Sequence, residues 1–332
     1  MGFDRLSPNG TGGIAPALVD RFNRDLLALT GPLAPASRFA LAVSGGPDSL
    51  ALLLLAQAAL PGRVQAATVD HGLRKEAVAE AKAVEALCRA LRVPHATLQV
   101  TVEPGGEGFQ ANARFARYHA LGRWMREEGL TTLLTAHHLD DQAETLLMRL
   151  ARGSGVGGLA GVRLCVSLPG VEGEVVRPLL KWRRTELAAL VDTVGLQPAH
   201  DPTNADPAYD RARLRAHLAH ASWLDPEPLA RSAAHLAEAE DALAWAADRL
   251  WGERTNARQD GLELDIREIP PELVRRLLRR AILACDPNAD PRGNELHRLA
   301  QALAAGEIRT LAGVMCTGGS VWRFSPAPPR RA

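Results

Sequence analysis

The sequence is poor in lysine and in cysteine. Of its 39 basic residues, only Lys75, Lys82 and Lys181 are lysines. Nearly every cation is therefore a guanidinium, whose planar fork of donors suits phosphate groups. A GC-rich coding sequence would produce the same bias, so both explanations stay open. The four cysteines are scattered without a Cys-x-x-Cys pair, which argues against a zinc site and a disulfide framework and fits a reducing cytoplasm.

Long hydrophobic runs and net charge are also missing. No apolar run reaches about 18 residues, and no basic start precedes an apolar core, so we expect neither a membrane span nor a signal peptide. The formal net charge is +1, so any nucleic-acid surface must come from local clusters. We expect a soluble, cytoplasmic protein of two domains, since 332 residues can form one α/β core and a smaller second unit.

The most informative segment is Ser44-Gly-Gly-Pro-Asp-Ser49, which lies between two apolar stretches. Residues 39–43 suit a strand covered on both faces, and residues 50–60 are rich in Ala and Leu, as in a buried helix. The two glycines allow a sharp turn, and the proline fits the first turn of a helix, whose free N–H groups attract anions. The segment therefore predicts a phosphate-binding loop.

This loop lacks the Gly-Lys-Ser/Thr of a Walker loop, so no lysine reaches the β- and γ-phosphates. It offers the Ser44 and Ser49 hydroxyls and the Asp48 carboxylate instead. A carboxylate beside phosphates is favourable when Mg²⁺ bridges the two. An ordinary strand-to-helix turn is the alternative, but the full hexapeptide favours a function. It resembles the pyrophosphate loop of the N-type ATP pyrophosphatases, which cleave ATP between its α- and β-phosphates and adenylate a substrate.

The chain after this loop alternates apolar runs with helical stretches. We predict strands at 64–69, 95–102 and 131–136, and helices at 77–91 and 109–128. Such alternation is typical of βαβ units, so the sequence predicts an α/β fold with a parallel sheet. Ligands of these sheets lie beyond the carboxyl ends of the strands, so the residues that follow each strand are candidates for a site.

The strand at 64–69 is followed by Asp70, His71 and Arg74, three candidate ligand contacts. Capping of a helix by Asp70 and solvation of Arg74 are the alternatives.

The helix at 109–128 carries Arg114, Arg117 and Tyr118 near one face because they are three and four residues apart. An arginine in the first turn opposes the helix dipole, a small cost that is easier to understand if Arg114 points at a bound anion. A solvated arginine face is the alternative.

The strand at 131–136 leads into His137-His-Leu-Asp-Asp-Gln-Ala-Glu144. Asp140 and Glu144 are four residues apart and share a helix face, where their repulsion predicts a nearby cation, either Mg²⁺ or an amine. Zinc is the alternative, but adjacent histidines point apart and the His-x-x-x-His helical pair is absent.

Two further segments leave their role open. Gly153–Gly161 is either a lid that closes over substrate or a simple loop. Arg211, Arg213 and Arg215 alternate along the chain and could face phosphate or acidic protein.

From Trp223 onward the composition changes to helices of Ala, Leu, Glu and Arg. We therefore divide the chain into residues 1–220, the catalytic domain, and residues 221–332, a smaller, mainly helical domain. An arginine stripe on the helix expected at 272–285 is a candidate RNA-backbone surface, with a solvated face as the alternative. The pattern at 311–324 is typical of a β-hairpin.

Five motifs, taken in order within residues 38–217, resemble the tRNA(Ile)-lysidine synthetase family. They are Ser-Gly-Gly-Pro-Asp-Ser, Val-Asp-His-Gly-Leu-Arg, Ala-Arg-Phe-Ala-Arg-Tyr, Ala-His-His-Leu-Asp-Asp-Gln-Ala-Glu-Thr and Arg-Pro-Leu-Leu. The resemblance implies an N-type ATP pyrophosphatase domain of the adenine nucleotide alpha hydrolase-like kind, followed by a tRNA-binding domain. It implies that ATP adenylates the wobble cytidine of tRNA(Ile) with a CAU anticodon, and that L-lysine then displaces AMP to give lysidine.

The resemblance also implies roles for individual residues. ATP would be bound by Ser44, Gly45, Gly46, Pro47, Asp48, Ser49, Asp70, His71 and His137. The catalytic residues would be Asp48, Asp141, Glu144 and Arg114, with Asp48 and Asp141 as Mg²⁺ ligands. The division of the three carboxylates between Mg²⁺ and lysine stays open.

Three other classes share some of these features. A tRNA thiolase should show a reactive cysteine or a cluster-binding cysteine pair, and a glutamine-dependent synthetase needs an amidotransferase domain. A non-catalytic nucleotide- or RNA-binding module would not need the carboxylates. The oligomeric state stays open, and a homodimer is among the assemblies that the sequence allows.

Overall fold

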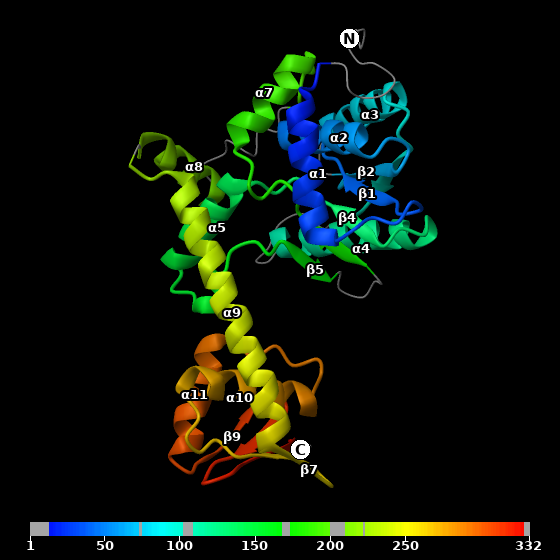
Figure 1. The fold of residues 1–332 in the computed structure, drawn as a ribbon. Coiled ribbons are helices and arrows are strands. Elements are labelled where there is room, and N and C mark those ends of the chain that lie inside the picture. The colour runs from blue at the N-terminus through cyan, green and yellow to red at the C-terminus, as the bar shows by residue number, and fades with distance from the viewer. Residues whose placement is uncertain are drawn as a thin grey trace. The chain divides into compact units, whose positions relative to one another are not determined.

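The computed structural model describes residues 13–72, 75–101, 109–167, 173–199, 210–221 and 223–328. The chain divides into two compact units, residues 1–237 and residues 238–332. The boundary falls within helix α9 (Pro226–Arg254), drawn in yellow in Figure 1. The division expected from composition, between residues 220 and 221, precedes this helix.

The first unit is built on a six-stranded sheet in the order β3-β2-β1-β4-β6-β5. Its strands are β1 (Phe39–Ala42), β2 (Val64–Asp70), β3 (His95–Gln99), β4 (Thr132–Leu134), β5 (Cys165–Ser167) and β6 (Glu174–Val176). Every neighbouring pair is parallel except β5 and β6. The predicted α/β fold with a parallel sheet is confirmed.

Helices precede, connect and follow these strands, and several of them cover the sheet (Figure 1). They are α1 (Pro16–Thr30), α2 (Pro47–Ala59), α3 (Lys75–Ala90), α4 (Phe109–Glu127), α5 (Leu139–Ala151), α6 (Val156–Leu159), α7 (Arg184–Val194) and α8 (Asp210–His220). In the described part of the chain no helix is long and apolar enough to cross a membrane.

Strand β1 shows why the sheet is covered on both faces. Successive residues of a strand point to opposite faces, so Phe39 and Leu41 join a core with α1, α2, α3 and α7, whereas Ala40 joins a core with α4. The small alanine side chain leaves room on that second face for Trp124 and Met125 of α4.

Helix α2 is buried on all sides. Residues 51–56 have no exposed surface, as expected for a helix that is apolar all round. Each fully buried leucine contributes about 1.5–3 kcal/mol relative to an exposed one. This packing fixes the amino-terminal end of α2, which begins at Pro47 within the predicted phosphate loop.

Parallel pairing brings the carboxyl ends of three strands to one edge of the sheet. Leu41 of β1 pairs with Ala66 of β2 and with Leu134 of β4. The segments that begin at Ser44 and at Thr135 therefore lie side by side. This is the edge at which the sequence predicts a site.

The second unit packs two helices, α10 (Pro271–Cys285) and α11 (Gly293–Ala304), with an antiparallel sheet in the order β7-β8-β11-β10-β9. The strands are β7 (Thr255–Arg258), β8 (Gly261–Leu264), β9 (Ile308–Leu311), β10 (Val314–Thr317) and β11 (Trp322–Pro326). The predicted carboxyl-terminal hairpin is confirmed by the pairing of β10 with β11. The strands β7, β8 and β9, each of four residues, were not predicted from the sequence.

Gly261 permits the close approach of β8 to β11. A Cβ atom at this position would lie 1.9 Å from the Phe324 carbonyl oxygen, and the residue has a φ of +156°. Only glycine fits so close an approach of two backbones.

Candidate active site

The predicted phosphate loop forms a tight turn between β1 and α2. Gly45 has a φ of +87°, and a Cβ there would lie 3.3 Å from Val84 Cγ2. The Ser49 hydroxyl donates to the Gly46 carbonyl over 2.9 Å and accepts from the Ser44 amide over 3.2 Å. Ser49 thus orders the loop from within.

The amino-terminal end of α2 faces this loop. Its helical hydrogen bonds begin with Leu50, which donates to Gly46, and among the described residues no side chain caps the end. Free N–H groups in the first turn and the helix dipole favour an anion there. The loop therefore has the chemistry of a phosphate site, as the sequence predicts.

Asp48 lies in the first turn of α2, and its two carboxylate oxygens have different surroundings. Its Oδ2 atom lies 3.5 Å from His138 Nε2. Its Oδ1 atom is buried and has no hydrogen-bond partner among the described residues. A buried oxygen without a partner is costly, so this atom is poised to bind a ligand.

His138 is almost completely buried among three carboxylates. Its Nε2 atom lies 3.5 Å from both Asp48 Oδ2 and Asp141 Oδ2, and its Nδ1 atom lies 3.6 Å from Asp140 Oδ2. Burial would lower the pKa of His138, but the carboxylates of Asp140, Asp48 and Asp141 outweigh burial and raise it to about 9. The imidazole is therefore a buried cation that links α2 to α5. The sequence analysis did not select His138.

His137 is in the opposite state. Burial, together with the cations Arg177, Arg114 and Arg211, outweighs the charge of Asp141 and lowers the pKa of His137 to about 4. The neutral ring accepts a hydrogen bond at Nδ1 from Arg177 Nε over 3.3 Å. The expectation that the two adjacent histidines point apart agrees with these separate surroundings.

The carboxylates of α5 each have their own cation. Asp140 Oδ2 faces His138 and also accepts a hydrogen bond from the Arg184 amide over 2.8 Å at the start of α7. Glu144, which is 3% exposed, accepts a hydrogen bond from Arg215 Nε over 2.6 Å and lies 3.0 Å from Arg211 Nε. Protein cations therefore lie beside both Asp140 and Glu144, and the expectation of Mg²⁺ or a substrate amine near the pair stays a prediction.

Asp141 lies between these two groups. Its Oδ2 atom accepts a hydrogen bond from the His138 amide over 3.1 Å, which caps α5, and its Oδ1 atom lies 3.7 Å from Arg215 and 3.9 Å from Arg211. Burial would raise the pKa of Asp141, but His138 and Arg211 lower it. Asp141 is therefore ionised, with one oxygen hydrogen-bonded and the other facing two guanidinium groups.

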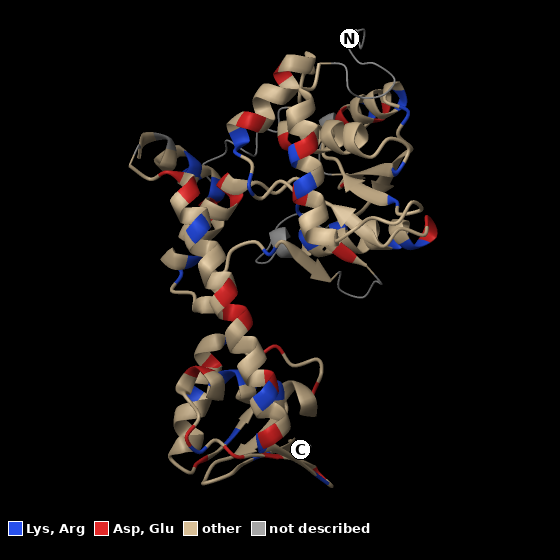
Figure 2. Cartoon of the chain, viewed as in Figure 1, with Lys and Arg blue, Asp and Glu red and all other residues tan. Residues whose placement is uncertain are grey.

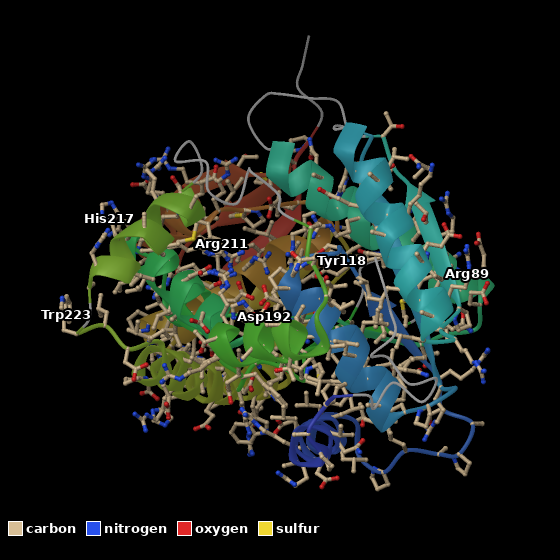
Figure 3. The ribbon with its side chains drawn as sticks, turned by 90° about the horizontal axis from the view of Figure 1, so that it is seen from above. Arg89, Tyr118, Asp192, Arg211, His217 and Trp223 are labelled. Carbon is tan, nitrogen blue, oxygen red and sulfur yellow. The ribbon has the colours of Figure 1, made fainter. Side chains whose placement is uncertain are left out.

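Two arginines of α8 complete the site, and sequence reasoning left their partners undecided. Arg211 and Arg215 are four residues apart on α8, so both reach α5. Figure 3 labels Arg211 on this helix, and Trp223, which is 81% exposed, at the outer edge. A helix places residues that are four apart on one face, so a helix prediction for this segment would have identified Arg211 and Arg215 as a pair.

The segment after β2 lies at the same edge. Asp70 is buried, and its two oxygens accept hydrogen bonds from the Gly72 amide over 2.9 Å and from Gln99 Nε2 over 3.1 Å. Asp70 therefore orders the turn through its own hydrogen bonds. This structural role is similar to the alternative in which Asp70 caps a helix rather than contacting a ligand. Burial and the nearby Arg117 lower the pKa of His71. Arg74 lies outside the described residues.

Helix α4 turns the predicted arginine face toward this edge. Arg114 stacks over the Tyr118 ring at 4.9 Å from the centroid, and its charge lowers the pKa of both His137 and Arg177. Because Arg117 acts on His71 in the same way, this face of α4 lies beside the candidate ATP residues. The structure thus gathers the predicted site residues from α2, α4, α5 and the turn after β2.

Comparisons with known proteins agree with this geometry. Residues 18–222 match the family model described as the PP-loop domain. The chain is 47% identical to the tRNA(Ile)-lysidine synthase of Novosphingobium aromaticivorans over 94% of each chain. It is 41% identical to that of Zymomonas mobilis, over 91% of this chain and 92% of the relative. The chain belongs to the tRNA(Ile)-lysidine synthase family.

One solved structure shows the same fold as this lysidine synthase family member. The U34-tRNA thiolase NcsA of Methanococcus maripaludis, solved with its [4Fe-4S] cluster, superposes with a TM-score of 0.53 at 20% identity. The match covers 67% of this chain and 80% of that one. It supports the PP-loop fold of the first unit.

The four cysteines of this member of the lysidine synthase family do not have the lowered pKa of reactive thiols. Burial raises the pKa of all four thiols, to about 12 for Cys88 and Cys316. Thiolate chemistry requires the opposite shift. The thiolase alternative is therefore not favoured.

The candidate Mg²⁺ ligands fit the ion unequally. Asp48 Oδ1 is buried beside the phosphate loop without a hydrogen-bond partner in the described part of the chain, and Mg²⁺ is commonly held by one or two carboxylates plus substrate phosphates. Asp141 is less available because both its oxygens are engaged. Within the described ranges no three His, Cys, Asp or Glu side chains could hold a metal ion by themselves, so phosphate oxygens would have to complete the ligand set.

The glycine-rich segment is tied to α5. Gln142 pairs with both backbone groups of Val162, donating over 2.7 Å and accepting over 2.6 Å, and Arg149 donates to the Gly158 carbonyl over 2.6 Å. The segment contains the short helix α6, which the glycine content did not predict.

Proposed function

We propose that this protein ligates L-lysine to C2 of the wobble cytidine in tRNA(Ile) with a CAU anticodon, converting ATP to AMP and pyrophosphate. One observation carries the proposal. His138 lies 3.5 Å from Asp48 in the phosphate loop and 3.5 Å from Asp141 of α5, so the loop and the α5 carboxylates belong to one buried site. The close relatives bear the name of this activity.

In the first step the cytidine O2 attacks the α-phosphorus of ATP. A bond forms between O2 and the phosphorus, the bond to the bridging oxygen breaks, and pyrophosphate leaves. The loop at 44–49 would bind the phosphates through its backbone N–H groups and the α2 dipole. Mg²⁺, held by Asp48 with Asp141 as a second candidate ligand, would offset charge on the departing pyrophosphate. Arg114 would contact ATP or the adenylated base.

In the second step the lysine ε-amine attacks C2 and AMP leaves. The ammonium group must first be bound by anions and must lose a proton before it attacks. Glu144 and Asp141 supply the buried anions, now neutralised by Arg211 and Arg215. Lysine binding would therefore exchange one cation for another at these carboxylates. The amine proton would pass to a carboxylate and then to solvent.

The second unit is proposed to bind tRNA, but its predicted arginine stripe is largely neutralised. Arg275 pairs with Glu272, Arg276 pairs with Glu240 over 2.6 Å, and Arg280 pairs with Asp248. Figure 2 shows acidic and basic residues interspersed over this unit. Phosphate contacts along α10 would have to displace these partners. We place the enzyme in the cytoplasm, where ATP, lysine and tRNA are available.

The decisive test is the transfer of radiolabelled lysine to unmodified tRNA(Ile) with a CAU anticodon, in the presence of ATP and Mg²⁺. Label should enter the tRNA, and it should be absent when the wobble cytidine is replaced by uridine. Pyrophosphate release that depends on another RNA or metabolite, without labelled tRNA, would overturn the substrate assignment.

Glu144→Gln should separate the two steps. The variant keeps the side-chain shape but removes the charge that would bind the lysine ammonium, so we expect lysine transfer to fall about 100-fold. Pyrophosphate release, which precedes lysine attack, should stay within about threefold of wild type. Glu186→Gln, which removes an ion pair with Arg21 outside the site, is the matched control. Equal loss of both steps would contradict a lysine-binding role.

A further inference from the structure

One face of α4 serves neither the core nor the ATP site. It carries Phe115, His119, Arg123 and Arg126, and we call these residues the α4 stripe. Their spacings of four, four and three residues place them in one row on a helix. All four side chains are exposed, whereas Leu121 of the same helix is buried against the sheet.

The stripe begins with two stacked aromatic rings. Phe115 is 65% exposed, and its ring lies 6.1 Å from that of His119 with an angle of 28° between the planes. A single exposed apolar residue needs no explanation. Here two aromatic rings lie next to each other on the helix surface, and the face of an exposed aromatic ring is a surface on which an unpaired base stacks.

The stripe continues with two cations, Arg123 and Arg126. In the described part of the chain neither Arg123 nor Arg126 forms an ion pair or a side-chain hydrogen bond, in contrast to the paired arginines Arg275, Arg276 and Arg280 of α10. Unpaired guanidinium groups are available to phosphates without the loss of an existing partner. Of the two arginine rows, the one on α4 is thus the better RNA surface.

The aromatic end of the stripe lies nearest the ATP site. Phe115 follows Arg114, whose charge acts on His137, and α4 begins at the ligand edge of the sheet because it follows β3. From Phe115 to Arg126 a helix rises about 16 Å. The rings and the two arginines can therefore contact different nucleotides of one strand.

We propose that the α4 stripe binds the anticodon arm of the substrate tRNA. An unpaired base beside the wobble nucleotide stacks on Phe115 and His119, and backbone phosphates of the same arm contact Arg123 and Arg126. This inference rests on the proposed function, because the base that reacts must leave its stack and enter the site, which leaves its neighbour unstacked. Stacking on the stripe compensates for that loss.

The test compares full-length variants by direct binding of unmodified tRNA(Ile) and by steady-state kinetics. Phe115→Ala should weaken tRNA binding about 5- to 100-fold, the range for one stacked base, and should raise KM for tRNA while KM for ATP and lysine stays unchanged. Phe115→Tyr should restore binding. The matched control is Trp223→Ala, which removes an even more exposed aromatic ring outside the stripe and should have no effect.

The arginines are tested through salt dependence. Arg123→Gln and Arg126→Gln should each lower the slope of log affinity against log salt concentration by about 1. Unchanged tRNA binding by Phe115→Ala and unchanged slopes, in an enzyme that forms lysidine, would overturn the α4 stripe alone. A wild-type protein that forms no lysidine would overturn the proposed function, and the stripe assignment would fall with it.

Discussion

Asp48→Asn should lower ATP-dependent pyrophosphate release by about 10²- to 10³-fold, the range for loss of one preorganised electrostatic group. The asparagine keeps the shape of the side chain, but it removes the charge that faces His138 at 3.5 Å and replaces one carboxylate oxygen with an amide. Affinity for tRNA should stay within about twofold, because Asp48 lies in the phosphate loop rather than on the α4 stripe.

Pyrophosphate release and tRNA binding should therefore be measured on the same preparation. Asp192→Asn is the control, since Asp192 is exposed on α7 and is labelled in Figure 3. Full pyrophosphate release by Asp48→Asn would remove Asp48 from the catalytic residues.

The buried cation His138 predicts a pH-dependent stability. The folded-state pKa of about 9 lies above the ordinary value of 6.5, so the stabilisation is fully present below pH 6.5 and is lost as the pH rises through 9. At about 1.36 kcal/mol per pKa unit, the free energy of unfolding should fall by about 3 kcal/mol over this range. Urea unfolding at several pH values measures the fall.

His138→Gln provides the comparison for this prediction. Its free energy of unfolding should lack that part of the pH dependence, while the contribution of the buried thiols above pH 8.5 is the same in both proteins and cancels. His217→Gln, at an exposed position of α8, should behave like wild type. Identical pH profiles for wild type and His138→Gln would show that His138 is not charged in the folded state.

The features of the fold that could be predicted from the sequence are those that depend on residues close together in the chain. The strand 39–43, the glycine turn and the apolar helix α2 follow from periodicity and backbone freedom over fewer than about 25 neighbouring residues. Asp48 and Glu144 were found because each follows a predicted strand, and the parallel sheet brings such positions to one edge.

The parts that were missed depend on contacts between distant segments. Glu144 and Arg215 are 71 residues apart in sequence, so nothing near either residue shows that they form an ion pair. The charge of His138 depends on three carboxylates, one of which, Asp48, comes from another helix. Gly261 is likewise required by Phe324, which lies far along the chain.

The strand order of the first sheet determines where Asp48 and His138 meet. From β1 the chain proceeds to β2 and β3 on one side, whereas β4 and β6 lie on the other, so β1 and β4 form a topological switch point at which the connecting helices diverge. Asp48 and His138 face each other across this point at 3.5 Å, so their proximity comes from the order of the strands. We therefore expect single substitutions at these two residues to abolish the chemistry while the strand order that brings α2 and α5 together persists.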